Sequence, residues 1–281
     1  MAGRIGKRTH LAPDLPVSTE TALFSLEVYN LYRALVQGQD AAPDPEPSPE
    51  PSLEPNQEPS LGGNLFWAGE LDATGSNLAV AGNVAGAATL TASCDSAAQR
   101  QAVRDGVIDF LVTSLDESLR ILKNEIRKGE TVAVCVASAP ADLVLEMETR
   151  GVRPDVLREV VLLSAADLEK SHRQSGELRV TWSIESAPAQ GLPKLDALAI
   201  ECLDSQDAVS RRWLRLAGRY LGRRGQNAHV LVADRAFAER FVARTREQIE
   251  SGAIMVRGRV QVRSAKGTEE FAFGPRTAGE A

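Results

Sequence analysis

The sequence predicts an α/β protein with a mainly parallel, Rossmann-like sheet, helices on both faces of that sheet, and a C-terminal α/β extension. From Asn64 onward, short apolar runs alternate with segments of helical period, which is the pattern of β–α–β units. The first apolar run, Leu65–Ala68, leads through a turn with Gly69 and Gly75 into a helix rich in alanine and glycine. A strand, a glycine-bearing turn and a helix of small residues in this order are typical of the start of a Rossmann domain.

Composition and periodicity divide the chain into five segments. We expect an N-terminal segment with one amphipathic helix (1–40), a disordered acidic, proline-rich linker (41–63), a Rossmann domain (64–175), an arginine-rich α/β extension (176–270) and a tail (271–281). The linker holds seven of the 14 prolines and five acidic residues without a base, so it cannot build a core.

The N-terminal segment carries one candidate helix, which opens near Ser18. Its apolar residues share one face and are Phe24, Val28, Leu31 and Leu35. A lone amphipathic helix next to a linker needs a surface to dock on. That surface is either the chain's own body, the same helix of a second copy, or a different protein.

Elements after the linker follow from the alternation of apolar runs and helical periods. The expected strands are Leu65–Ala68, Ala88–Cys94, Thr131–Ala137, Glu159–Leu163, Leu178–Ile184, Leu195–Leu203, His229–Ala233 and Ile254–Val262. The expected helices are Asn77–Ala87, Ala97–Asp105, Leu115–Lys128, Ala141–Arg150, Ser205–Gly222 and Arg235–Ser251. The last 18 residues lose periodicity, so we expect them to fray.

Several function classes are not supported by the composition. No run approaches 18 apolar residues and no apolar export signal opens the chain, so we expect a cytoplasmic protein without a membrane segment. Cys94, Cys135 and Cys202 lie far apart in apolar runs, which indicates free buried thiols instead of disulfides. No zinc-ligand spacing joins them to a histidine, so no metal site is expected. We expect His172 at the surface and His229 in the core or at a strand edge.

The turn after the first strand is the candidate cofactor site. Free N–H groups at the start of the following helix would point at a dinucleotide pyrophosphate. The glycine fingerprint is incomplete, however, and Glu70 and Asp72 would place negative charge beside a phosphate. Ser93, at the end of the second strand, is too short to replace the carboxylate that normally holds the ribose, and Asp95 comes two residues later. The residue chemistry alone therefore argues against a conventional NAD site.

A series of short motifs nevertheless resembles the NAD-binding domain of the urocanase (urocanate hydratase) family from about Gly63 to Val156. These motifs are Trp67-Ala68-Gly69-Glu70-Leu71-Asp72-Ala73-Thr74-Gly75-Ser76, Val84-Ala85-Gly86-Ala87, Gly106-Val107-Ile108-Asp109, Ser114-Leu115-Asp116-Glu117-Ser118-Leu119, Ala141-Asp142-Leu143-Val144 and Arg150-Gly151-Val152-Arg153-Pro154-Asp155. The resemblance implies a Rossmann fold that holds NAD⁺ tightly, where NAD⁺ adds as an electrophile to the imidazole of urocanate. The positions it would place at the cofactor are Gly69, Ala73, Thr74, Gly75, Ser93, Ser138 and Ala139.

Departures from the family pattern fall at those same positions. Asp72–Ser76 replaces the family's Gly-Gly-Met-Gly-Gly turn, Ser93 replaces a ribose-binding Glu, and Ala98 replaces an Arg. Ser138–Pro140 replaces Gly-Asn-Ala, and Val160–Ser164 replaces Gln-Thr-Ser-Ala-His. The core domain with the family's catalytic cysteine has no counterpart here. We therefore expect a stand-alone urocanase-like module with an interaction or regulatory role and no hydratase activity or bound cofactor. The alternative is an NAD- or nucleotide-binding component of a urocanate hydratase-like lyase that works with a separate partner.

An arginine-rich segment follows the resembling region. Residues 205–263 hold 13 arginines and five acidic residues, although the whole chain carries a net charge of −6. One helix places Arg211, Arg215, Arg219 and Arg223 at intervals of four, with Trp213 and Tyr220 on the opposing, core-facing side. This arginine stripe is either an anion or partner surface, or a set of side chains that pair with the acidic body. We expect a protein partner or self-association, most simply a homo-oligomer, and do not expect nucleic-acid binding.

Overall fold

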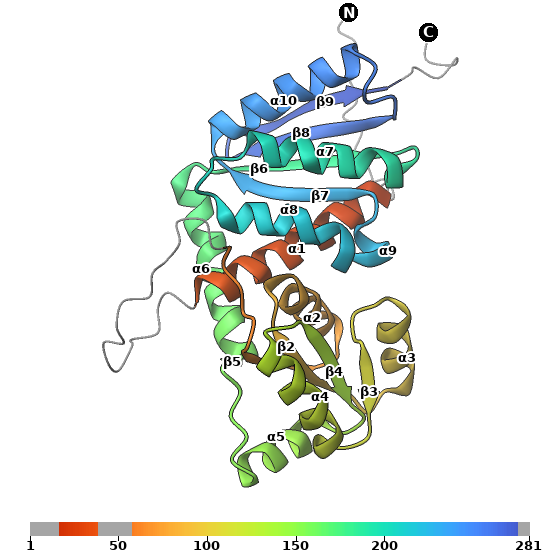
Figure 1. The fold of residues 1–281 in the computed structure, drawn as a ribbon. Coiled ribbons are helices and arrows are strands. Elements are labelled where there is room, and N and C mark those ends of the chain that lie inside the picture. The colour runs from red at the N-terminus through yellow and green to blue at the C-terminus, as the bar shows by residue number, and fades with distance from the viewer. Residues whose placement is uncertain (1–16, 39–57, 275–281) are drawn as a thin grey trace, which may run out of the picture.

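The computed structural model describes residues 17–38 and 58–274, which form two sheets with helices packed against them (Figure 1). The first sheet contains β1 (Leu65–Glu70), β2 (Ala88–Ala92), β3 (Phe110–Val112), β4 (Val132–Val136) and β5 (Val156–Leu157). Its strands are parallel and lie in the order β3-β4-β2-β1-β5. The predicted α/β class with a parallel Rossmann-like sheet is therefore confirmed.

The second sheet is antiparallel and belongs to the C-terminal part of the chain. It contains β6 (Leu178–Ile184), β7 (Ala228–Ala233), β8 (Gly258–Ser264) and β9 (Gly267–Phe273), in the order β7-β6-β8-β9. The helices are α1 (Val17–Gln37), α2 (Ala73–Ala85), α3 (Ser96–Arg104), α4 (Leu115–Lys128), α5 (Pro140–Thr149), α6 (Arg158–Ser175), α7 (Pro188–Cys202), α8 (Ala208–Tyr220), α9 (Gly222–Gly225) and α10 (Arg235–Glu250).

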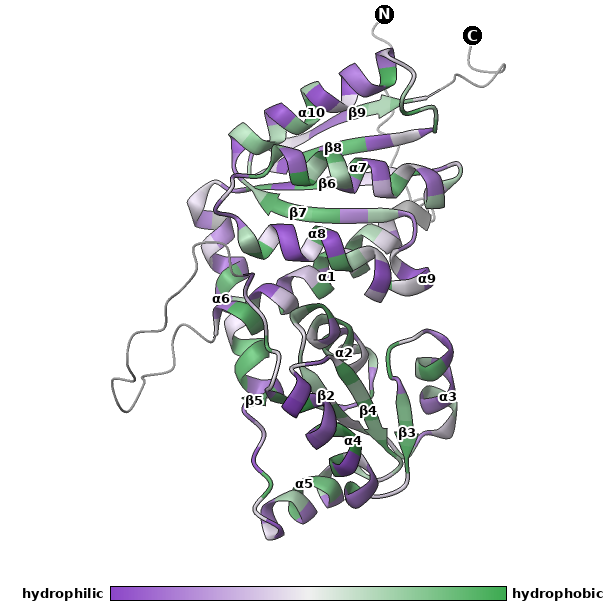
Figure 2. Ribbon diagram, viewed as in Figure 1, coloured by the Kyte–Doolittle hydropathy of each residue, from purple (hydrophilic) through white to green (hydrophobic). Residues whose placement is uncertain are grey.

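The central strands of the parallel sheet are buried on both faces, which explains why they read as continuous apolar runs. Alternate residues of β1 enter two separate cores: Phe66 and Ala68 pack with α1 and α2, whereas Leu65 and Trp67 pack with α4 and α5. The strands accordingly form the most hydrophobic layer of this half of the molecule (Figure 2).

Helix α1 lies between the two sheets and packs against α2, α6 and β7 (Figure 1). Val28, Tyr29 and Tyr32 are fully buried in this position. The Ser25 hydroxyl donates to the Ala228 carbonyl oxygen at 2.9 Å, and the Tyr32 hydroxyl donates to the Val209 carbonyl oxygen at 3.0 Å. Of the three docking surfaces open to this helix, the structure selects the chain's own body.

Two expected strands are helices. Glu159–Leu163 lies in the first turns of α6, and Leu195–Leu203 falls almost entirely in α7. In α7 the buried residues Leu195, Leu198 and Cys202 recur at helical spacing, and a short apolar run cannot by itself distinguish a strand from one buried face of a helix.

Other expectations need smaller corrections. The last 18 residues do not all fray, because Gly267–Phe273 forms β9 against β8, and residues 275–281 lie outside the described part. The expected strand Ile254–Val262 begins only at Gly258. Cys135 and Cys202 are buried as predicted, but Cys94 lies in the loop after β2 and is exposed. None of the helices within residues 17–38 and 58–274 is long and apolar enough to cross a membrane.

Candidate functional site

The carboxyl edge of the parallel sheet gathers all the positions that the sequence predicts for a cofactor. Gly69 lies near the end of β1, and Ala73, Thr74 and Gly75 form the first turn of α2. Ser93 follows β2, and Ser138 and Ala139 follow β4. Because β1, β2 and β4 are parallel neighbours, these segments meet at one edge, the usual ligand site of such sheets.

Helix α2 is capped at its N-terminus by the side chain of Asp72, the residue that precedes it. The Asp72 Oδ1 atom accepts a hydrogen bond from the Gly75 N–H at 2.6 Å. Gly75 is needed for this close approach, because a Cβ atom there would lie 1.8 Å from the Glu70 carbonyl oxygen. The one glycine that survives from the family's turn therefore serves the local backbone packing.

Arg158, the first residue of α6, covers the same helix start. Its Nη2 atom lies 3.1 Å from Asp72 Oδ2, and its Nη1 atom donates to the Glu70 carbonyl oxygen at 3.1 Å. Burial would raise the pKa of Asp72, but the hydrogen bond from Gly75 and the bonds and charge of Arg158 together hold that pKa below its usual value. The side chain of Arg158 also passes over Gly69, where a Cβ atom would lie 2.7 Å from Arg158 Cδ.

Ser93 and Ser138, at the ends of β2 and β4, differ in how their hydroxyl groups are used. The Ser93 Oγ atom accepts from the Asp95 N–H at 3.1 Å, and its carbonyl oxygen accepts from Gln99 Nε2 at 2.6 Å. Ser93 thus closes the loop that starts α3. The Ser138 Oγ atom is buried and has no hydrogen-bond partner among the residues that the structure describes.

The residues of this edge do not fit a dinucleotide pyrophosphate. The N–H groups at a helix start attract phosphate, but here a carboxylate already occupies that position. A cleft of about 480 Å³ lies next to it, and its charged lining residues are Glu70, Asp72, Glu148, Arg158 and Glu159. One cation among four carboxylates would repel a phosphate ester, so this edge offers no complementary charge for NAD.

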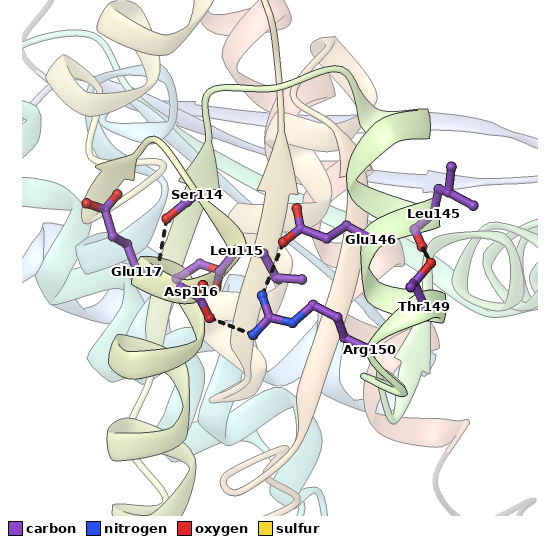
Figure 3. Close-up of polar contacts among 9 residues, drawn as sticks. Ser114, Leu115, Asp116, Glu117, Leu145, Glu146, Thr149 and Arg150 are labelled. Carbon is purple, nitrogen blue, oxygen red and sulfur yellow. Dashed lines mark hydrogen bonds and ion pairs between the residues drawn. The ribbon is translucent and has the colours of Figure 1, made fainter.

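Several motifs that carry the family resemblance contact one another at structural positions. Ser114 caps α4, and Asp116 in its first turn pairs with Arg150 at the end of α5, with Asp116 Oδ1 and Arg150 Nη2 separated by 2.5 Å (Figure 3). Asp155 accepts from the Leu65 N–H at 2.7 Å, and Asp109 accepts from the Ala133 N–H at 2.8 Å. These motifs therefore fix strand starts and helix ends of the Rossmann domain.

The predicted arginine stripe does not lie on one helix: Arg211, Arg215 and Arg219 belong to α8, which ends at Tyr220, and Arg223 belongs to the short helix α9. Arg211 donates to the Asp204 carbonyl oxygen at 3.3 Å, Arg215 pairs with Glu58, and Arg219 lies over the Tyr220 ring. Arg223 is exposed and makes no hydrogen bond or ion pair within residues 17–38 and 58–274. Trp213 is buried in the core as predicted, and Tyr220 is half-buried.

Two other arginines of this region contact α2, and the sequence does not predict them. The Arg212 Nε atom donates to the Val84 carbonyl oxygen of α2 at 2.9 Å. Arg224 donates to Asn77 Oδ1 at 3.2 Å and lies 3.8 Å from the centroid of the Phe24 ring. Their only signal in the sequence is position: they follow Arg211 and Arg223 by one residue and so point to a different side of the chain.

The two described histidines lie apart from this edge. His229 is buried as predicted, and its Nδ1 atom lies 2.9 Å from Asp196 Oδ1. The surface prediction for His172 is wrong, because its side chain is only 14% exposed and contacts Arg33 and Glu177. Among the described residues no group of three or more His, Cys, Asp or Glu side chains is arranged to hold a metal ion.

Residues 54–164 match the family model of the urocanase Rossmann-like domain. The match includes all five strands of the parallel sheet and ends inside α6. The resemblance seen in the sequence from about Gly63 to Val156 is thereby confirmed. The antiparallel sheet and helices α7–α10 lie outside the matched residues.

Proposed function

We propose that this chain, whose residues 54–164 form a urocanase Rossmann-like domain, is a non-catalytic interaction or regulatory module. One observation carries this proposal: the Asp72 carboxylate caps α2 at the position where a Rossmann domain binds pyrophosphate, and Arg158 neutralises it. A ligand phosphate would have to displace this ion pair and would then meet Glu70 and Glu159. The module retains the fold, while Asp72, Arg158 and Ser93 serve internal contacts.

The replaced family residues support the same conclusion. Removing one hydrogen-bonding group from a buried binding site costs about 1–3 kcal/mol of binding free energy. The Ser93 hydroxyl accepts a hydrogen bond from Asp95 in the loop before α3, and the Ala98 side chain has no polar group that could bind a cofactor. Five replaced positions together would remove most of the affinity that keeps a cofactor bound through purification.

An exposed apolar face supports the interaction role. Leu157 at the end of β5 and Val160 and Leu163 in the first turns of α6 recur every three residues and are 42%, 54% and 69% exposed. We call these three residues the α6 apolar face. Val160 and Leu163 belong to the segment 160–164, where the family carries Gln-Thr-Ser-Ala-His, so a mainly apolar segment replaces a mainly polar one. Contiguous exposed apolar residues of this kind are typical of protein contacts, and we propose a second copy of the chain as the occupant.

Two measurements on one sample test the proposal. Native mass spectrometry of the untreated protein should give a mass without NAD, and calorimetric titration with NAD⁺ should give no heat of binding. A urocanase that retains its cofactor is the positive control. A bound NAD mass, or micromolar NAD⁺ affinity, would refute the proposal and favour the NAD-binding lyase component.

A further inference from the structure

One face of the antiparallel sheet is only half covered. Helices α7 and α10 pack on the first face, where Val180 and Trp182 of β6 are buried. On the opposite face α1 covers β7 and reaches only the near side of β6. The remainder, over β6, β8 and the start of β9, forms a pocket of about 200 Å³ beside α1.

The charges in this pocket are all of one sign. Its charged lining residues are Arg179, Arg259 and Arg263, and no carboxylate lines it. Arg259 is already neutralised, because it pairs with Glu185 and with Glu270. The side chains of Arg179 and Arg263 make no hydrogen bond or ion pair within the described part of the chain.

Arg179 and Arg263 also lie directly opposite each other. They are cross-strand partners in the antiparallel pairing of β6 with β8. Like charges at such positions destabilise a sheet unless an anion lies between them. Burial and the charge of Arg263 lower the pKa of Arg179, and the charge of Glu169 opposes this only in part. The pair therefore costs stability in the unliganded chain.

The rest of the lining is suited to an oxyanion. Thr181 lies next to Arg179 on the same face of β6, and Thr268 is the cross-strand partner of Arg263 on β9. These hydroxyl groups add donors beside the two guanidinium groups. Ala22, Leu23 and Leu26 of α1 form an apolar wall opposite them. The volume admits one phosphate with a small organic body and is too small for a dinucleotide.

We propose that Arg179 and Arg263 bind the phosphate group of a small ligand on this sheet face. Two guanidinium groups suit a phosphate better than a carboxylate, because a phosphate carries up to two negative charges and offers enough oxygens for a bidentate contact with each group. The site is independent of the Rossmann edge, so it stands whether or not NAD binds there.

Thermal unfolding of the full chain tests the site, with inorganic phosphate as the probe and chloride at equal ionic strength as the reference. Phosphate should raise the Tm of the wild type, and Arg263→Gln and Arg179→Gln should each abolish the rise. Both variants should melt at or above the wild-type temperature without phosphate, because each removes a like-charge contact. Arg100→Gln, an equal charge change on the exposed face of α3, should leave the phosphate response intact.

Calorimetry then distinguishes the source of the phosphate group. Arg263→Gln should weaken phosphate binding by about tenfold or more. Tighter binding of glycerol 3-phosphate than of inorganic phosphate would assign the site to phosphate esters, and equal binding would assign it to the free anion. No phosphate response in the wild type, or an equal response in Arg263→Gln and Arg100→Gln, would overturn the proposal. If Arg179→Gln does not fold, the more exposed Arg263→Gln still decides the question.

Discussion

Arg158 and Asp72 form an ion pair across the start of α2, with Arg158 Nη2 3.1 Å from Asp72 Oδ2. The pair joins the first residue of α6 to the cap of the helix that in Rossmann domains receives a pyrophosphate. Here the positive end of that helix is satisfied from within the chain. The same arrangement gives the Rossmann domain a stabilising contact and, in the function we propose, takes the place of its anion site.

Removing the Asp72 carboxylate should therefore destabilise the protein in a pH-dependent way. Asp72→Ala should lower the free energy of unfolding by about 1 kcal/mol at neutral pH, the usual cost of a lost N-cap. The folded pKa of Asp72 lies below its unfolded value, so its contribution is present above the unfolded pKa of about 3.9 and is lost as the pH falls through the folded pKa.

Urea unfolding of the wild type and of Asp72→Ala between neutral and acidic pH measures this difference. The difference between the two stabilities should begin to shrink below the unfolded pKa of Asp72 and level off below its folded pKa. Arg158→Gln should remove part of the same pH-dependent difference, because it leaves the cap but deletes the ion pair. A difference that stays constant down to the folded pKa would contradict the assigned role of Asp72.

Two glycines should respond in opposite ways to the same substitution. Gly75→Ala places a Cβ atom 1.8 Å from the Glu70 carbonyl oxygen, so the start of α2 must shift, and we expect a loss of about 2 kcal/mol or more. Gly218 lies within α8, and a Cβ atom there would contact only His229 Cε1, at 3.8 Å. Gly218→Ala should therefore stabilise the protein by about 0.5–1 kcal/mol, the difference in helix propensity. Thermal unfolding of both variants checks the two signs, and a stable Gly75→Ala protein would show that the tight approach is not required.

The sequence carries much of this fold but little of its candidate site. Strands β1, β2 and β4 could be predicted because both faces are buried and their apolar runs are bounded by turns. The strand predicted at 159–163 is wrong because a short apolar run with two valines resembles a strand, whereas the residues form a helix that leaves Val160 and Leu163 exposed. Arg158 could not be predicted as the partner of Asp72, since 86 residues separate them and no local pattern joins them. The sequence likewise could not place the two like charges of Arg179 and Arg263 opposite each other, because this depends on the register of β6 and β8, which periodicity does not fix.

The buried Asp196 holds two donors in the core of the C-terminal sheet. Trp182 Nε1 donates to Asp196 Oδ1 at 2.8 Å, and His229 Nδ1 lies 2.9 Å from the same oxygen. Asp196→Ala would leave both groups buried without an acceptor, so we expect a loss of about 3 kcal/mol or more in the free energy of unfolding. Asp196→Asn, which retains one carbonyl oxygen, should lose less. The exposed Asp142→Ala should change stability by less than about 0.5 kcal/mol, and an equal loss in Asp142→Ala and Asp196→Ala would show that burial of this carboxylate has no energetic role.

Arg223 and Arg224 are neighbours in α9 and allow a matched test of the contact between this helix and the Rossmann domain. Both residues are exposed, but Arg224 bonds to Asn77 of α2 and lies over the Phe24 ring of α1, whereas Arg223 has no partner among the described residues. Arg224→Gln should cost about 1–2 kcal/mol, from one hydrogen bond and one cation–π contact. Arg223→Gln should be close to neutral. Chemical denaturation of both proteins makes the comparison, and equal effects would mean that the contact between Arg224 and the Rossmann domain contributes nothing.

The α6 apolar face should determine the oligomeric state. Leu163 is the most exposed residue of this face, so a charge there would have to be desolvated in any contact between copies. If copies of the chain associate through this face as proposed, Leu163→Glu should convert the dimer into a monomer without unfolding the chain, because the side chain contributes little to the core. Sedimentation velocity over a range of concentrations measures the change, and circular dichroism confirms the fold. Leu145→Glu is the matched control, since Leu145 is also exposed, at 64%, but lies on α5. A wild-type monomer at all concentrations, or a dimer that survives Leu163→Glu, would exclude this face as the self-association surface and direct the search to a different protein partner.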